Sequence, residues 1–240
     1  MSSLSIGRQK NANAWFTPMN NAARLTKKIA VLLFGLLLSG CTQSFAQSPS
    51  HEEWFLGFGA PDYMEVWIET ADVVDIHERL LRTAVAGVAS VQTPRNNKGK
   101  PVGWPVNPGS GAGHYIRQVD LPRLIYVRWQ SLAEPQTYEA YIVIPESARE
   151  IMRKPEKAFC TADAKWITDY RDDIGIGLAP GGIAKVWLGG TCLKSVEIAR
   201  VEGRINPKGP YGGKSGGKHR PLTETSKAYI EKFGIPYGSW

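Results

Sequence analysis

Hydrophobic and polar residues alternate along several short stretches of this chain, and a period of two predicts β-strands. The pattern predicts strands over residues 62–70, 123–130, 137–144, 183–188 and 191–205. In the second stretch Leu124, Tyr126 and Arg128 fall on one side, and Ile125, Val127 and Trp129 fall on the other. Pro122 and Pro145 bracket the second and third stretches, so we expect these two to pair as an antiparallel hairpin.

Three stretches have helical character instead. Residues 146–153 predict a short helix, and 222–233 predict a terminal helix that stops at Gly234. The stretch 72–88 carries an apolar stripe at helical spacing but also tolerates an extended chain, and we interpret it as a helix. Between 93 and 113 the many Pro, Gly and Asn residues predict a long surface loop.

These elements predict a mainly β (α+β) fold, built as an antiparallel β-sheet or sandwich with short peripheral helices. Glycines 189 and 190 separate the last two strands and predict the turn of a second hairpin. Trp67, Trp129 and Trp187 lie within predicted strands, and we expect them to fill the core.

The longest uninterrupted apolar run covers residues 29–38, and it is about half the length that a membrane-spanning helix needs. Lys27 and Lys28 precede it, and Ser39-Gly40-Cys41 follow it. This arrangement resembles a bacterial lipoprotein signal, and the resemblance implies that Cys41 carries a thioether-linked lipid. A buried core helix would also fit the length of the run, but its flanks favour the signal.

This resemblance divides the chain. Residues 1–40 are expected to be a signal peptide whose true start is either Met1 or Met19, and 41–50 a lipidated, flexible tether. Residues 51–240 are then expected to form a single periplasmic domain. Lipoproteins kept at the inner membrane often have Asp after the modified cysteine, so Thr42 favours the periplasmic face of the outer membrane.

The net charge changes once the signal is set aside. The whole sequence carries +7, but residues 1–40 hold five basic residues and no acid, which leaves 24 basic minus 22 acidic residues, or +2. A basic balance of this size gives no support to nucleic-acid binding.

Two cysteines remain besides Cys41, and an oxidising periplasm favours a disulfide between Cys160 and Cys192. Such a bond would stabilise the fold by about 3 to 4 kcal/mol in the chain-entropy model. The alternative is a reactive or metal-binding thiol, but the sequence has no CxxC pair and no histidine at metal-ligand spacing from either cysteine. We therefore expect no metal and no small-molecule cofactor.

The strongest candidate binding surface is a basic, glycine-rich loop over 204–220. Its candidate residues are Arg204, Lys208, Tyr211, Lys214, Lys218 and Arg220. Such a run is commonly solvated, and its functional reading is contact with phospholipid head groups or with an acidic patch on a protein. Trp104, in the predicted surface loop, is a second candidate anchor for a partner.

Catalytic motifs find little support. Gly213-Lys214-Ser215-Gly216-Gly217 satisfies G-x-S-x-G, but no strand leads into Ser215 and no helix leaves it, so a flexible loop is favoured over a nucleophile elbow. The acidic sets around residues 65–75 and 169–173 lack the spacing of a calcium loop, and a solvated acidic face is the commoner explanation.

Scattered aromatic and proline residues carry a family resemblance over about residues 50–205. They are Trp54 with Phe55, Ala60-Pro61 with Tyr63 and Val66, Val127-x-Trp129-x-Ser131-x-x-Glu134, Tyr138 and Pro145. The chain resembles the Domain of Unknown Function 2931 family of bacterial lipoproteins. The resemblance implies a mostly β envelope protein, and it supplies no catalytic residues.

Together these patterns favour a noncatalytic binding protein, attached to the membrane through its N-terminal lipid and facing a protein partner. The sharpest hypothesis is an immunity-type inhibitor of an antibacterial toxin, such as a phospholipase delivered by type VI secretion. The alternatives are a structural lipoprotein of the cell envelope and, less favoured, an envelope hydrolase.

Overall fold

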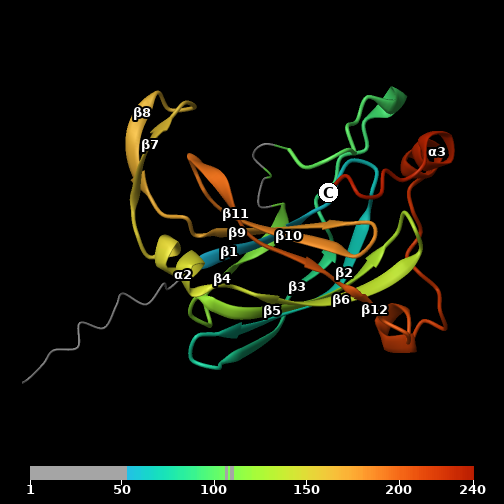
Figure 1. The fold of residues 1–240 in the computed structure, drawn as a ribbon, viewed down its shortest axis with the longest axis horizontal. Helices are drawn as coiled ribbons and strands as arrows, with labels where there is room; N and C mark the ends of the chain where they lie inside the picture. Colours follow the sequence, from blue (N-terminus) through green and yellow to red (C-terminus); the bar gives the residue numbers. More distant parts are fainter. Residues whose placement is uncertain (1–52, 106–107, 109–110) are drawn as a thin grey trace, which may run out of the picture. The chain divides into compact units, whose positions relative to one another are not determined.

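The computed structural model describes residues 53–105, 108 and 111–240 (Figure 1). The predicted signal peptide, Cys41 and the tether lie outside the described residues. The strands are β1 (Trp54–Gly59), β2 (Val66–Asp75), β3 (Leu80–Val88), β4 (Ala112–Ile116), β5 (Pro122–Ser131), β6 (Gln136–Val143), β7 (Glu156–Cys160), β8 (Lys165–Asp169), β9 (Asp173–Ala179), β10 (Ile183–Gly190), β11 (Leu193–Glu202) and β12 (Arg204–Ile205). The helices are α2 (Glu146–Met152) and α3 (Glu224–Phe233), with 3-10 turns at Arg95–Asn97 and Pro210–Gly213.

The strands form two five-stranded sheets and one separate hairpin. Sheet A has the order β11-β10-β9-β1-β4, sheet B has the order β12-β6-β5-β2-β3, and β7 pairs only with β8. All pairs are antiparallel except β1 with β9. Figure 1 shows the two sheets one above the other, with the β7-β8 hairpin projecting beside them. The fold is therefore mainly β, as the alternation predicted.

The inner faces of both sheets share one hydrophobic core. Trp54, Phe58 and Ile176 from sheet A pack in the same buried cluster as Ile125 and Trp129 from sheet B. Trp129 is fully buried, as predicted, and Ile125 and Val127 on the same side of β5 are fully buried with it. Because successive strand residues point to opposite faces, the residues between them are free to build the outer face of sheet B.

Both predicted hairpins are present, but the turn of the second lies at other residues than predicted. β5 pairs with β6, and β10 pairs with β11, both antiparallel. The second turn consists of Thr191 and Cys192 rather than Gly189-Gly190, which lie in β10. A side chain at Gly190 would come within 2.4 Å of the Tyr170 carbonyl oxygen, so close backbone approach, and not a turn, explains this glycine.

The predicted helix over 72–88 is wrong. β2 continues to Asp75, and β3 returns beside it as an antiparallel strand. The buried Asp75 carboxylate accepts the backbone N–H groups of His77 at 2.8 Å and Arg79 at 2.9 Å, and this closes the turn. Register shifts between β2 and β3 interrupt the period of two, which is why the apolar spacing imitated a helix.

The two other predicted helices are confirmed as α2 and α3. Thr223 caps the start of α3 by accepting the Ser226 backbone N–H, and Gly234 ends the helix with a φ of 75°. Neither helix among the described residues is long and apolar enough to cross a membrane.

Candidate functional site

The glycine-rich loop (204–220) lies on the outer face of sheet B as a defined structure. It starts as β12, and the backbone N–H of Asn206 then donates to the Thr137 carbonyl oxygen at 2.9 Å. Gly209 and Gly212 have φ values of 69° and 63°, which a residue with a side chain adopts at a cost. These glycines therefore allow the loop to turn tightly over the sheet.

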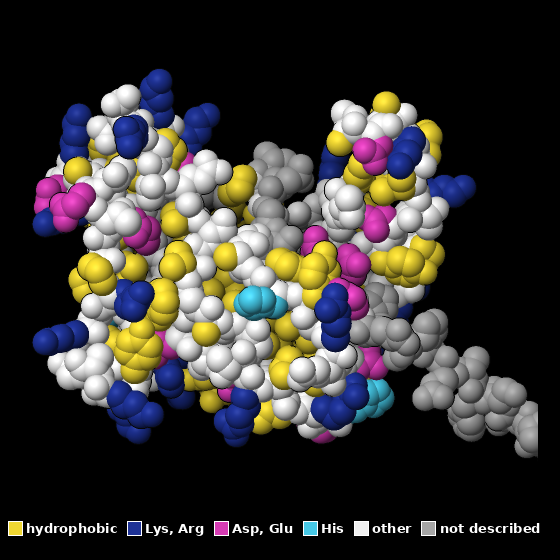
Figure 2. All heavy atoms as spheres, turned by 180° about the vertical axis from the view of Figure 1, so that it is seen from behind, with side chains coloured by type: hydrophobic (Ala, Val, Ile, Leu, Met, Phe, Trp, Pro, Cys, Tyr) yellow, Lys and Arg dark blue, Asp and Glu magenta, His cyan; other side chains and the backbone are white. Residues whose placement is uncertain are grey.

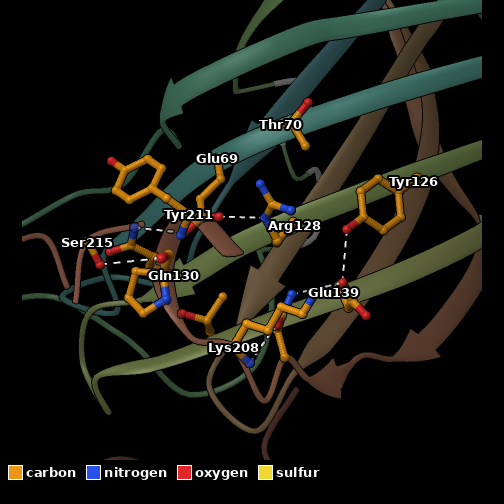
Figure 3. Close-up of polar contacts among 12 residues, drawn as sticks. Glu69, Thr70, Tyr126, Arg128, Gln130, Glu139, Lys208, Tyr211 and Ser215 are labelled. Carbon is orange, nitrogen blue, oxygen red and sulfur yellow. Dashed lines mark hydrogen bonds and ion pairs between the residues drawn. The ribbon is translucent and has the colours of Figure 1, made fainter. Parts of the chain in front are cut away.

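A buried carboxylate beneath the loop ties it to the sheet. The side chain of Glu69, on β2, is fully buried and accepts the Arg128 Nε–H at 2.5 Å and the Gln130 side-chain amide at 2.9 Å. Its third donor is the backbone N–H of Tyr211 at 2.7 Å, from the middle of the loop (Figure 3). Burial opposes the charge of Arg128, but its hydrogen bond and attraction to Glu69 raise its pKa above the ordinary value.

A second carboxylate, Glu139 on β6, organises the neighbouring side of the site. It accepts the Tyr126 hydroxyl at 2.9 Å, the Asn206 amide at 3.1 Å and the Arg204 Nε–H at 2.8 Å. Burial together with the hydrogen bond to Glu139 raises the pKa of Tyr126 to about 12. Tyr126 is therefore a neutral donor at physiological pH.

Between the loop and the sheet lies a cavity of about 570 Å³, here called the basic cavity. Its lining residues are Arg128, Glu139, Arg204, Ile205, Asn206, Pro207, Lys208, Tyr211, Gly212 and Lys214. Glu69 and Glu139 balance the two arginines, whereas the two lysines form no ion pair among the described residues. The cavity therefore carries an excess of about two positive charges and is suited to bind an anionic group.

The structure brings together four of the six predicted loop residues. Arg204, Lys208, Tyr211 and Lys214 line the basic cavity. Arg220 lies outside it, with its guanidinium carbon 3.8 Å from the centre of the Trp67 ring and its backbone N–H on the Gln130 side chain at 2.8 Å. Lys218, which lies between Lys214 and Arg220 in sequence, is exposed and does not line the cavity.

Four tryptophans and the disulfide complete the account of the predicted residues. Trp104 packs against Trp187 on sheet A with ring centroids 5.2 Å apart, and it does not line the basic cavity. Trp187 and Trp129 are buried as predicted, whereas Trp67 is only half-buried, beneath Arg220. Cys160 and Cys192 form a disulfide with their Cα atoms 5.1 Å apart, which confirms the predicted pairing.

The hydroxyl and imidazole groups of the loop form hydrogen bonds within the fold. The Ser215 hydroxyl donates to the Pro210 carbonyl oxygen at 3.3 Å, and His219 contacts the Thr137 hydroxyl at 3.2 Å. Burial lowers the pKa of His219, against smaller opposing effects from the Gly217 backbone and Glu69. Within the described ranges, no three His, Cys, Asp or Glu side chains gather as metal ligands.

Sequence reasoning missed the floor of this site, which consists of Glu69, Arg128 and Glu139. Arg128 and Glu139 are direct partners in the β5-β6 register, and Arg128 is beside Thr70 of β2. The sequence signal that could have revealed this floor is the charged residues at the outward positions of strands whose inward positions are aromatic or β-branched. Such charges are commonly solvated, and only strand pairing shows that these three converge.

Comparison with known proteins places the chain in a family. No curated protein and no solved structure matches it significantly. A family model described as "Protein of unknown function (DUF2931)" matches residues 41–238, which is most of the chain. The sequence resemblance is thereby confirmed, and the chain belongs to the DUF2931 family.

Proposed function

We propose that this chain is a lipid-anchored periplasmic binding protein without catalytic activity, and that its basic cavity captures an acidic segment of a protein partner. The partner class is an antibacterial toxin, so that the chain acts as an immunity-type inhibitor, with a type VI phospholipase as the leading case. Lipid on Cys41 would hold the inhibitor at the periplasmic face of the outer membrane, in the compartment where such a toxin arrives.

The observation that carries this proposal is the unbalanced charge of a pre-formed cavity. Lys208 and Lys214 are exposed at its edge, while the loop that bears them is fixed to the buried Glu69. Fixing the loop before binding reduces the entropy lost when a partner docks. A carboxylate that pairs with these lysines would meet donors already in place.

The surroundings of the cavity favour a polypeptide over a small free anion. Ile205, which is 56% exposed, and the partly buried Tyr211 both line the cavity. Protein interfaces combine such apolar and aromatic contacts with a charged rim. A single small anion would use the lysines but leave this apolar surface in water.

The test is a titration of the full chain with the protein encoded by the adjacent gene, followed by calorimetry. We expect submicromolar, stoichiometric binding that weakens as salt rises, because exposed ion pairs are screened. The double variant Lys208→Glu/Lys214→Glu should weaken binding at least about tenfold, since it places like charges against an acidic segment. Lys227→Glu, on the exposed face of α3, is the matched control and should bind as the native chain does.

Cells provide the second readout. Expression of the native chain should protect sensitive cells from the toxin, and the double variant should lose that protection at equal abundance. No binding to the neighbouring protein, or no protection, would remove the inhibitor proposal. Hydrolysis of a lipid or cell-wall substrate by the pure chain, abolished by a point substitution, would establish the enzyme alternative instead.

A further inference from the structure

The β7-β8 hairpin presents an aromatic face to solvent. Phe159 and Trp166 are direct partners in its register, with ring centroids 5.7 Å apart, and Lys157 and Thr168 are the next pair on the same face. Trp166 is 72% exposed, the largest exposure recorded for a large hydrophobic side chain among the described residues. Figure 2 shows hydrophobic and basic side chains together on the projecting hairpin, at the upper right of that view.

The hairpin is fixed to sheet A at both of its ends. At the tip, Cys160 is bonded to Cys192 in the β10-β11 turn. At the base, the buried Arg171 donates its Nε–H to Glu156 at 2.6 Å and also binds the Lys194 carbonyl oxygen. A two-stranded hairpin is marginally stable alone, so these two attachments are what hold its aromatic face in a fixed orientation.

The first described strand, β1, begins beside the base of this hairpin. The backbone N–H of Phe55 donates to the carbonyl oxygen of Asp172, the residue after Arg171, at 2.8 Å. Only eleven residues lie between Cys41 and Glu53, which limits the distance between these two residues to about 40 Å. A five-residue strand is about 17 Å long, so a lipid at Cys41 and the hairpin face are able to reach the same bilayer.

A second aromatic and basic group lies at the start of β1. The rings of Phe55 and Tyr115 are 5.2 Å apart, and Tyr115 is 60% exposed. The guanidinium carbon of Arg117 is 5.8 Å from the centre of the Tyr115 ring, and the same guanidinium pairs with Glu53 at 2.7 Å. Aromatic rings beside Lys and Arg are enriched where proteins meet the lipid head-group region, because the ring is amphipathic and the cations pair with phosphates.

We propose that the outer face of the β7-β8 hairpin inserts into the head-group region of the membrane that carries the Cys41 lipid. The inference rests on the anchor included in the proposed function. Trp166 and Phe159 would lie at the boundary between head groups and acyl chains, and Lys157 would extend to lipid phosphates. Such a contact would orient the tethered domain, since anchoring supplies a high local concentration of bilayer.

The experiment uses the full chain, acylated at Cys41 and reconstituted into phosphatidylethanolamine and phosphatidylglycerol vesicles with brominated acyl chains. Bromine quenches the fluorescence of tryptophan that lies near it, so the emission of the native protein should fall on these vesicles. In Trp166→Phe the quenching should be smaller by at least about half. Val143→Phe, an exposed β6 position on the outer face of sheet B, is the matched control and should be quenched like the native chain.

A second arm separates the hairpin from the anchor. The processed Cys41→Ser chain, residues 41–240 without the expected signal, should still bind the same vesicles weakly, and adding Trp166→Ser with Phe159→Ser should reduce its partitioning about tenfold. An unacylated natural protein would overturn the anchor, but the Cys41→Ser chain would still test the hairpin. The hairpin proposal would be overturned if the native chain and Trp166→Phe were quenched equally, or if the double variant partitioned as Cys41→Ser does. Either result would also be expected if this face binds a protein instead of a membrane.

Discussion

The glycine-rich loop and the β7-β8 hairpin both lie outside the hydrophobic core, yet they are fixed in different ways. The loop has little regular structure and is held by donors that converge on the buried Glu69. The hairpin has regular strand pairing and is held by a covalent bond at Cys160 and an ion pair at Glu156. The comparison shows that a surface segment without a core of its own becomes ordered through a few specific attachments.

Removing the covalent attachment should have the largest effect. Cys160→Ser with Cys192→Ser frees a loop whose ends are 32 residues apart, and we expect a loss of about 3 to 4 kcal/mol of unfolding free energy. Chemical denaturation measures it, and reduction of the native disulfide should give a similar loss. A change below about 1 kcal/mol would show that Arg171 alone fixes the hairpin.

Removing the buried acceptor should affect the loop next most strongly. Glu69→Leu leaves the Arg128 guanidinium, the Gln130 amide and the Tyr211 N–H without their carboxylate, and we expect a loss of about 2 to 3 kcal/mol. Denaturation with hydrogen exchange at the loop provides the measurement.

Glu78→Leu is the matched control for this buried carboxylate. Glu78 pairs with Arg123 in water, so its removal should change stability by no more than about 0.5 kcal/mol. Equal effects of the two substitutions would mean that burial of Glu69 contributes nothing to the attachment of the loop.

The end of the loop should respond less. Arg220→Ala removes a guanidinium that stacks on Trp67, and we expect a loss of about 0.5 to 1 kcal/mol. Arg220→Lys should recover part of it, while the backbone hydrogen bond to Gln130 is kept in both variants. Tryptophan fluorescence with denaturation would detect the change, and an Arg220→Ala protein as stable as the native one would assign no role to the stacking.

Protonation of His219 at acidic pH should have the smallest effect on stability, and the effect should be confined to the loop. Burial lowers the pKa of His219 in the folded state below its ordinary 6.5, so the unfolded chain binds the proton first. The contribution of His219 is therefore present above pH 6.5 and is lost as pH falls below it. Denaturation midpoints at pH 7 and pH 5 should differ less in His219→Gln than in the native chain, and equal differences would contradict this assignment.

Local patterns were sufficient where one face of an element is buried in a regular way. The alternation around Ile125 and Val127 predicted β5 and its partner, and Gly234 marked the end of α3. The pattern failed at 72–88, because the turn there depends on Asp75 and on bulged pairing rather than on apolar spacing. The β7-β8 hairpin was not predicted either, since its aromatic residues face solvent and give no inward alternation.

The sequence by itself determined the family, the mainly β class and the pairing of the two cysteines of the domain, because these follow from composition, period and scattered anchors along the chain. Only the tertiary structure decided that lysines of the loop face a cavity whose floor comes from β5 and β6, with the loop fixed to Glu69 of β2. Strand pairing brings Glu69, Arg128 and Glu139 together, because backbone hydrogen bonds between neighbouring strands set which side chains lie side by side. The backbone N–H of Tyr211, in the loop, then binds Glu69.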